Sequence, residues 1–259
     1  MVLVCNDPAF VFLKTRKTAG TSIEMALEPC CAPPGHQVVE RTEPVVSDRG
    51  IVGARLVPVR KSRLPRFARK LALPEWHSHM TAKDARRRLG ARRFAAATKI
   101  SAVREPFARV VSLFHWQMKS RNIPVADPHD AFARWIRTDW PTDLDVVAID
   151  GRVVVDRFIR FEHLAEDVSD LAGDLGLSLD FSTLPHAKDN ARSRSAPVAT
   201  YYSEDIADIV RDRMAWAFAA GGYSAGLPHP PTHTDQDPRK PAAPGDEHIH
   251  GPNPHEVTP

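Results

Sequence analysis

Basic and hydroxyl side chains crowd one short stretch of the chain, Lys17-Thr-Ala-Gly-Thr-Ser22. It follows an apolar run from Ala9 to Leu13 that has the length of a buried strand, and the residues from Thr21 onward are typical of a helix. The first amides of a helix have no partner inside it, and the helix dipole favours an anion beside them. The stretch therefore predicts an anion-binding loop between a strand and a helix.

This loop does not belong to the Walker A class of nucleotide-binding loops. That class requires the pattern G-x-x-x-x-G-K-S/T, and the glycines it needs are missing before Lys17. No other stretch of the sequence fits the pattern. The loop therefore disfavours an ATP or GTP hydrolase, and an ordinary solvated turn is the alternative to an anion site.

A second candidate anion site follows another apolar run, Ile100 to Val103, which we expect to be a buried strand. Arg104 would lie at the carboxyl end of that strand, where open α/β sheets bind their ligands. Pro106 suits the first turn of a helix, and Ser112 would lie further along it. Because a guanidinium group can bind phosphate oxygens with two parallel hydrogen bonds, Arg104 is a candidate phosphate ligand.

Two histidines, His77 and His79, precede a helix that Thr81 and Asp84 should cap and that we expect from Ala82 to Leu89. Imidazole titrates near neutral pH, so either ring is suited to take the proton of a hydroxyl group. The alternative is that both are loop histidines hydrogen-bonded to the backbone. The His-x-His spacing lacks a third ligand, and no metal site is expected.

The two motifs together resemble those of sulfotransferases that use 3′-phosphoadenosine-5′-phosphosulfate (PAPS). Their 5′-phosphosulfate loop usually reads Lys-Thr-Gly/Ala-Gly-Thr-Ser, often after a proline that is replaced here by Arg16. Their 3′-phosphate motif, Arg-x-Pro-x-x-Arg-x-x-Ser, matches this chain at every specified position, and these are Arg104, Pro106, Arg109 and Ser112. The resemblance covers roughly residues 6 to 225.

This resemblance implies a three-layer, P-loop-like α/β domain with a parallel central sheet flanked by helices. It also implies transfer of a sulfuryl group from PAPS to an acceptor hydroxyl, for which a carbohydrate is one candidate. Lys17 would stabilise the leaving phosphate oxygen. Members of this family that act on sugars often have a histidine just before a Thr-Ala helix start, which matches His79-Met-Thr-Ala82, so His79 would take the acceptor proton and His77 is the second choice. Arg104 and Ser112 would hold the 3′-phosphate, while Arg109 would support them or lie at the surface. The 5′-phosphosulfate would be held by the rest of the loop, namely Thr18, Ala19, Gly20, Thr21 and Ser22.

We expect residues 1–226 to form this one domain, with an irregular insertion at about 30–75 and a disordered, Pro- and His-rich tail at 227–259. The insertion would carry short strands at 38–39 and 51–59. A hairpin is expected at Asp150-Gly151, and helices are expected at 164–175 and 204–219. The resemblance further implies that a late basic loop, with Arg192 or Arg194, would contact cofactor or acceptor.

The formal net charge of +3 is unevenly distributed, because basic residues crowd between Arg55 and Arg109. Such a field attracts anions, either nucleotide phosphates or an acidic acceptor, and for most of these arginines a solvated helix face is the preferred alternative. Interleaved aromatics are lacking, so no nucleic acid partner is expected. The three cysteines, Cys5, Cys30 and Cys31, form no C-x-x-C spacing, and we expect inert reduced thiols.

No apolar run approaches the ~18 residues needed to span a bilayer, and no signal segment opens the chain, so we expect a cytoplasmic protein without a membrane span. Two other functions stay open. One is a non-catalytic protein that binds a nucleotide or an anionic glycan on the same fold. The other is a small-molecule kinase, for which the Walker lysine and magnesium-binding carboxylates are not identified. The sequence does not determine the oligomeric state.

Overall fold

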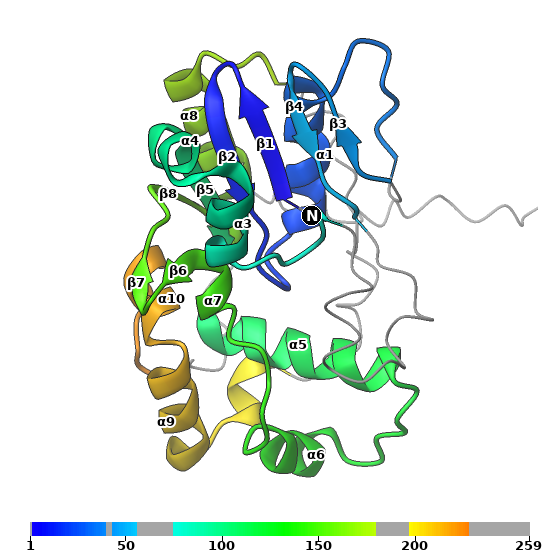
Figure 1. Ribbon diagram of the computed structural model, residues 1–259. Helices are drawn as coiled ribbons and strands as arrows, with labels where there is room; N and C mark the ends of the chain where they lie inside the picture. The colour runs from blue at the N-terminus through cyan, green and yellow to red at the C-terminus, as the bar shows by residue number, and fades with distance from the viewer. Residues whose placement is uncertain (1, 40–42, 56–74, 180–196, 228–259) are drawn as a thin grey trace, which may run out of the picture.

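A six-stranded sheet with strand order β3-β4-β1-β2-β5-β8 forms the centre of the computed structural model, which describes residues 2–39, 43–55, 75–179 and 197–227 (Figure 1). Its strands are β1 (Val2–Asn6), β2 (Ala9–Leu13), β3 (Val45–Val46), β4 (Gly50–Val52), β5 (Thr98–Val103) and β8 (Arg157–Arg160). β2 has the predicted bounds, and β5 begins at Thr98 instead of Ile100.

The sheet is mixed, which corrects the expectation of a parallel central sheet. β2, β5 and β8 run parallel, whereas β1 is antiparallel to both β2 and β4, and β3 is antiparallel to β4. Only Asp7 and Pro8 connect β1 to β2. So short a connection joins antiparallel neighbours, since parallel neighbours need a long crossover. The parallel part of the sheet therefore begins at β2, the strand that leads into the predicted loop.

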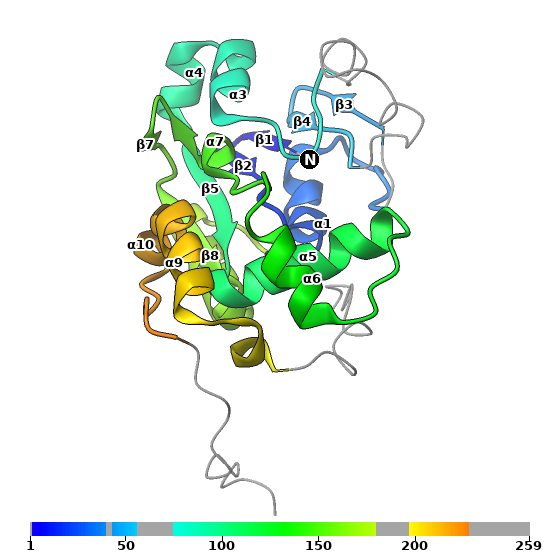
Figure 2. The same ribbon diagram turned by 90° about the horizontal axis from the view of Figure 1, so that it is seen from below.

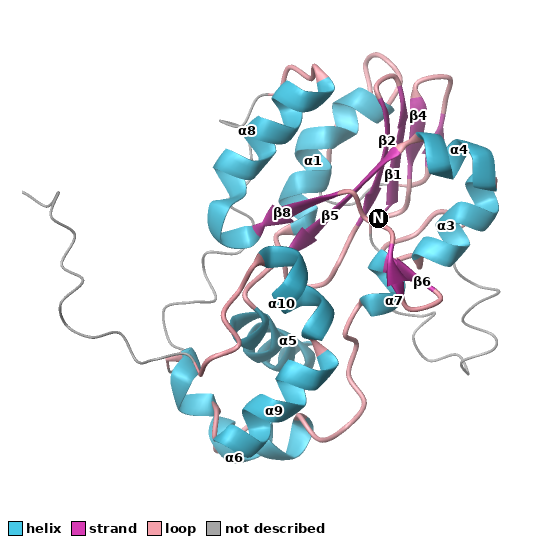
Figure 3. Cartoon of the chain, turned by 90° about the vertical axis from the view of Figure 1, so that its left-hand side faces the viewer, coloured by secondary structure: helices cyan, strands magenta, loops and turns pink. Residues whose placement is uncertain are grey.

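Helices cover both faces of the sheet (Figure 3). One face carries α1 (Gly20–Cys31) and α8 (Leu164–Leu175), and the other carries α3 (Ala82–Leu89), α4 (Ala91–Ala96) and α7 (Leu144–Val147). Successive side chains of β2 alternate between the faces, as in any strand. Phe10 and Phe12 pack with the α1 and α8 side chains, while Val11 and Leu13 pack with those of α3 and α7. Burial on both faces fixes the position at which β2 ends.

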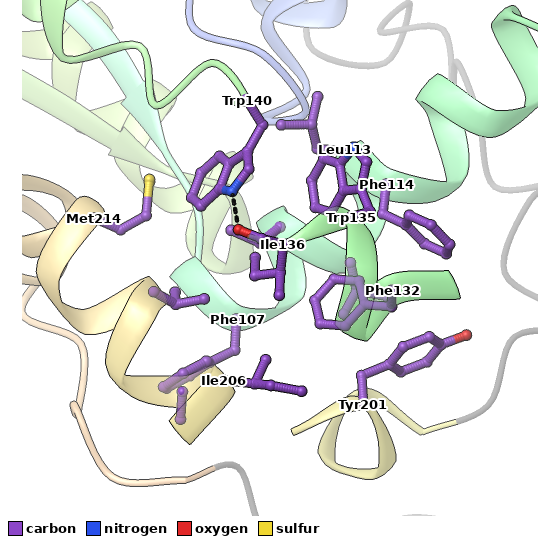
Figure 4. Packing of buried hydrophobic residues seen from close by; sticks show 14 of the residues in the cluster. Phe107, Leu113, Phe114, Phe132, Trp135, Ile136, Trp140, Tyr201, Ile206 and Met214 are labelled. Atoms are coloured by element: carbon purple, nitrogen blue, oxygen red, sulfur yellow. Dashed lines mark hydrogen bonds between the residues drawn. The ribbon is translucent and has the colours of Figure 1, made fainter. Parts of the chain in front are cut away.

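A second, helical core lies below the sheet (Figures 1 and 2). Its elements are α5 (Pro106–Ser120), α6 (Pro128–Trp135), η4 (Val198–Tyr201), α9 (Glu204–Arg213) and α10 (Ala215–Gly221). Aromatic side chains fill it, with Phe107 and Phe114 of α5 packed among Phe132, Trp135 and Tyr201 (Figure 4). α5 is thereby anchored along its length, and its first turn is held beside the end of β5.

Local signals predicted several of these elements correctly. The Thr81 Oγ1 atom accepts the Asp84 N–H at 3.0 Å and begins α3 at Ala82. Asp150 and Gly151 have positive φ angles and join the hairpin strands β6 (Ala148–Ile149) and β7 (Arg152–Val153). α8 ends at Leu175, before the left-handed Gly176. Each signal involves residues only a few positions apart.

Two expectations in the connecting segments are wrong. Residues 38–39 form no strand, whereas the start of the strand expected at 51–59 is confirmed by β4 (Gly50–Val52), and β3 (Val45–Val46) is an edge strand that was not expected. The helix expected at 204–219 divides at Met214 into α9 and α10, because Met214 leaves the helical conformation. The described residues do not include part of the strand expected at 51–59, Arg192, Arg194 or the tail beyond residue 227. Within the described ranges, no helix combines the length and the apolar character that a membrane span requires.

Candidate functional site

The two predicted anion-binding motifs lie side by side. β2 and β5 are parallel neighbours with Leu13 opposite Ser101, so both strands end at the same edge of the sheet. The loop follows β2 and Arg104 follows β5. The Arg104 Nη1 atom donates to the carbonyl oxygen of Lys17 at 3.3 Å, and its guanidinium lies 4.3 Å from the centre of the Phe161 ring. Pairing of β2 with β5 thus joins residues 87 positions apart in the sequence.

The loop backbone contains two non-glycine residues with positive φ angles. Lys17 and Ala19 have φ angles of 66° and 57°, whereas Thr18 between them does not have a positive φ. Alternation of this kind turns successive backbone N–H groups toward one side, where they bind anions. Ala19 is the N-cap of α1 and makes no side-chain capping hydrogen bond. The start of α1 therefore presents amides that no cap side chain of this helix covers.

Hydroxyl groups of the loop form hydrogen bonds within the protein, whereas we expected them to bind the ligand. Thr18 is buried, and its Oγ1 atom lies 2.9 Å from the Oγ1 of Thr15. Thr15 in turn donates to the Ala102 carbonyl of β5 at 2.5 Å. Thr21 Oγ1 accepts a hydrogen bond from Lys14 Nζ at 3.0 Å. These contacts fix the loop, so that its backbone and the half-buried Lys17 are the groups best placed to meet a ligand.

Gly20 is needed because the Lys14 side chain passes directly beneath it. A Cβ atom at residue 20 would lie 2.8 Å from the Lys14 Cγ atom. The far end of that lysine is held by a buried ion pair, with Nζ 2.6 Å from Glu24 Oε2. The glycine in the predicted motif therefore has a steric role in addition to its place at the start of α1.

We expect Gly20→Ala to lower the free energy of unfolding by about 1–3 kcal/mol, the usual cost of overpacking a buried site. Urea unfolding followed by circular dichroism measures the change. Gly173→Ala in α8 is the matched control, because nothing lies within 4 Å of a Cβ atom at that position. A loss of the same size in both variants would contradict the steric explanation.

The Lys14–Glu24 ion pair belongs to a buried ionic cluster that the sequence did not reveal. Arg55 pairs with Glu28, and its Nε atom lies 3.7 Å from Glu24 Oε2. His36 Nε2 lies 2.7 Å from Glu28 Oε1. Arg55 is 3% exposed, so this member of the basic stretch does not belong to a solvated face. The cluster ties the middle and the last part of α1 to the expected insertion.

Asp143 connects the loop to the second motif, and sequence reasoning missed it. Its Oδ2 atom accepts the backbone N–H of Arg16 and the Arg109 Nη2–H, each at 2.6 Å, and its carboxylate also pairs with the Arg16 guanidinium. Arg109 Nε donates to the Arg16 carbonyl at 3.1 Å. Arg109 is 1% exposed, so the alternative that it lies at the surface is wrong. It supports the loop from below.

The protonation state of Asp143 follows from these neighbours. Burial alone would raise its pKa, but the charges of Arg109 and Arg16 outweigh burial and lower the pKa below 3.8. Asp143 is therefore ionised at neutral pH. No motif or spacing marks it in the sequence, because it lies 34 residues from Arg109 and 127 residues from Arg16.

His79 is the histidine that reaches the loop. Its Nδ1 atom lies 2.9 Å from the Lys14 carbonyl oxygen, which can only accept, so Nδ1 carries the proton and Nε2 is left as an acceptor. Burial, and next the charge of Arg16, lower the pKa of His79 well below 6.5. His77 instead bonds the neighbouring Ser78 carbonyl, with Nδ1 2.9 Å from the oxygen. Both rings are bonded to the backbone, but only His79 is bonded to the loop.

The remaining candidate, Ser112, lies on the half-buried side of α5, two turns beyond Arg104. In the part of the chain that the structure describes, no group of three or more His, Cys, Asp or Glu residues is arranged to hold a metal ion.

Comparison of the chain with protein-family models, with curated proteins and with solved structures gives no match. The geometry of the loop and of the residues around it is therefore what supports a function for this protein.

Proposed function

We propose that the protein is a sulfotransferase that transfers a sulfuryl group from PAPS to an acceptor hydroxyl. The observation that carries the proposal is the 3.3 Å contact between Arg104 of one motif and the Lys17 carbonyl of the other. Two motifs that resemble the 5′- and 3′-phosphate sites of such enzymes thus adjoin at one edge of the sheet. An adenosine that bears both phosphates would be bound by cationic and amide groups that lie side by side.

The residues present suit PAPS as a donor substrate. The uncapped start of α1 and the left-handed loop residues favour an anion at the 5′-phosphosulfate position. The half-buried Arg104 would bind the 3′-phosphate together with Ser112. Lys17 would stabilise the negative charge that develops on the phosphate oxygen as its bond to sulfur breaks. Positioning and charge stabilisation supply most of the catalysis in such group transfers.

In this proposal His79 is the general base. The acceptor O–H gives its proton to His79 Nε2 while its oxygen forms the bond to sulfur, and the adenosine phosphate leaves with the electron pair of the S–O bond. The hydrogen bond from Nδ1 to the Lys14 carbonyl holds the ring in the tautomer that this step requires. The same bond ties the base to the strand-to-loop junction that positions Lys17.

The pH dependence tests the base. Since the pKa of His79 is lowered well below 6.5, we expect kcat/KM to be constant from pH 8 to about 6.5 and to fall only in more acidic solution. His79→Gln should lower kcat by about 10²–10⁴-fold and leave nucleotide affinity unchanged. His77→Gln is the control, because His77 bonds Ser78 and not the loop. A larger loss of kcat in the His77 variant would indicate that His77, and not His79, is the general base.

The acceptor is proposed to be a hydroxyl compound such as an acidic carbohydrate. α3 begins three residues after His79, and α3 and α4 together expose six cations and contain a single acidic residue, Asp84. These cations are Lys83, Arg86, Arg87, Arg88, Arg92 and Arg93. A hollow of about 560 Å³ lies between the two helices. An anionic acceptor bound there would lie close to the proposed base.

Calorimetric titration tests the donor site directly. The protein should bind 3′-phosphoadenosine-5′-phosphate more tightly than AMP or ATP. Arg104→Ala should weaken binding of the 3′-phosphorylated nucleotide by about 10–100-fold, the loss expected for hydrogen bonds to a charged group. It should weaken AMP binding much less, because AMP lacks the 3′-phosphate and senses only the lost hydrogen bond to the Lys17 carbonyl. Arg121→Ala, at the exposed far end of α5, is the control.

The other outcomes of this titration are informative. Equal affinity for AMP and for the 3′-phosphorylated nucleotide would exclude the proposed donor. Tighter binding of ATP would favour a kinase. Tight binding of the 3′-phosphorylated nucleotide without sulfuryl transfer to any of a broad set of hydroxyl acceptors would favour a non-catalytic binding protein.

A further inference from the structure

The side chain of Arg104 is held from the neighbouring strand, β8. β5 and β8 pair in parallel with Val103 opposite Arg160, so Arg104 and Phe161 follow the two strand ends side by side. The Arg104 guanidinium lies 4.3 Å from the centre of the Phe161 ring. A guanidinium over the face of an aromatic ring is attracted by the π electrons of that ring. Phe161 therefore orients the side chain that we propose as the 3′-phosphate ligand.

The next residue, Glu162, holds the backbone that follows Arg104. Its Oε1 atom accepts the Glu105 N–H at 3.1 Å. The Glu105 carboxylate in turn accepts the N–H groups of Phe107 and Ala108, at 3.0 Å and 2.6 Å, and caps α5. Glu162 thereby fixes the peptide between Arg104 and the first turn of α5.

Tyr223 anchors Glu162 from beyond the end of α10, although the two residues are 61 positions apart. The Tyr223 hydroxyl group donates to Glu162 Oε2 at 2.7 Å. Both carboxylate oxygens of Glu162 are thus hydrogen-bonded, one to each neighbour. These two bonds restrict the rotation of a side chain that would otherwise move freely, because Glu162 is exposed.

Two glycines allow Tyr223 to reach Glu162. Gly222 ends α10 with a φ angle of 65°, a left-handed conformation that glycine adopts without steric cost. The Tyr223 N–H donates to the Phe218 carbonyl oxygen at 3.0 Å, so the chain turns back on the helix. The Tyr223 ring then lies against Gly221, where a Cβ atom would be 2.7 Å from the Tyr223 Cζ atom. The sequence Gly221-Gly222-Tyr223 therefore places a hydroxyl group beside the Glu162 carboxylate.

We propose that Phe161, Glu162 and Tyr223 are positioning residues that hold Arg104 in place for the 3′-phosphate of the donor. A guanidinium makes two parallel hydrogen bonds to a phosphate only when its plane faces the phosphate oxygens. Phe161 orients that plane, Glu162 fixes the backbone beside it, and Tyr223 holds Glu162. The ligand in this inference rests on the proposed function, whereas the position of Arg104 can be measured without any nucleotide.

The first test is calorimetric titration with 3′-phosphoadenosine-5′-phosphate. Glu162→Ala should weaken binding by about 5–20-fold, within the range of coupling between residues in contact. In the Arg104→Ala background the same replacement should change the affinity by less than about twofold, because its effect passes through Arg104. Glu162→Gln keeps a hydrogen-bond acceptor and should bind almost as well as the wild type. Glu166→Ala is the matched control, because Glu166 is exposed four residues further on.

The second test is modification by phenylglyoxal, which reacts with accessible guanidinium groups and needs no nucleotide. Peptide mapping by mass spectrometry gives the rate of modification at Arg104. We expect this rate to be higher in Glu162→Ala and in Gly221→Ala than in the wild type. Arg213 is the internal control, since its guanidinium also lies over an aromatic ring, 4.1 Å from the centre of Trp140. Its rate should be the same in all variants.

Equal modification rates at Arg104 in all variants would overturn the positioning role. An equal loss of affinity with and without Arg104 would also overturn it, as would a loss in Glu162→Gln as large as in Glu162→Ala. If the wild type does not prefer the 3′-phosphorylated nucleotide, the proposed function fails, and the modification rates still decide whether these residues position Arg104. Circular dichroism confirms that each variant is folded. If Glu162→Ala does not fold, Tyr223→Phe takes its place, because it removes only the hydroxyl group.

Discussion

Lys17→Ala is expected to slow the proposed sulfuryl transfer by about 10²–10³-fold, the effect of removing one group that stabilises transition-state charge. Lys17 is half-buried in the middle of the left-handed turn, beside the start of α1. Its carbonyl oxygen is bonded to Arg104, so the backbone at this position is fixed independently of the side chain. Loss of the ammonium group should therefore act on the transition state and leave the loop in place.

Steady-state kinetics with PAPS and a responsive acceptor measure this loss, which should appear in kcat more than in KM. Lys119→Ala, at the exposed end of α5, is the control for general loss of a lysine. Circular dichroism and the melting temperature of the Lys17 variant should equal those of the wild type. A kcat within about threefold of the wild-type value would remove Lys17 from the proposed chemistry.

Asp143→Ala is expected to lower the free energy of unfolding by about 3–5 kcal/mol, because it leaves the Arg109 charge buried without its carboxylate. Asp143 and Arg109 are each 1% exposed, and two of the three hydrogen bonds that link Arg16 to these residues end on Asp143. The variant should also lose nucleotide affinity, since the Arg16 backbone is held by this carboxylate. Denaturant unfolding and calorimetric titration measure the two effects.

Asp145→Ala is the matched control, because Asp145 is exposed two residues further on. Asp143→Asn keeps an acceptor without the charge and should cost less than the alanine variant. The ion pair of Asp143 and Arg109 also predicts that the free energy of unfolding depends on pH. Because the folded-state pKa of Asp143 is lowered below 3.8, its contribution is complete above that pH and is lost as the pH falls through the folded-state pKa. Equal stability of the Asp143 and Asp145 variants would contradict this account.

Features that depend on near neighbours could be predicted from the sequence. Examples are the apolar run of β2, the Thr81 cap of α3 and the Asp150-Gly151 turn. Each depends on residues that are only a few positions apart in the sequence. The positions of Lys17 and Arg104 at strand ends follow from the same local patterns. Because β2 and β5 pair in parallel, the ends of the two strands lie side by side, and this brings Lys17 and Arg104 together.

The tertiary structure decided what depends on residues far apart in the chain. The two-residue turn at Asp7 and Pro8 reverses β1, so that half of the sheet is antiparallel. Chain crossings place Asp143 beneath the loop and Cys5 beside the end of α1. Ion pairs and thiol contacts carry no periodicity in the sequence, because a charge or a sulfur atom finds its partner only when burial brings distant segments to within a few ångströms. Local propensity therefore determined the elements and their ends, whereas burial decided which polar side chains hold the candidate site together.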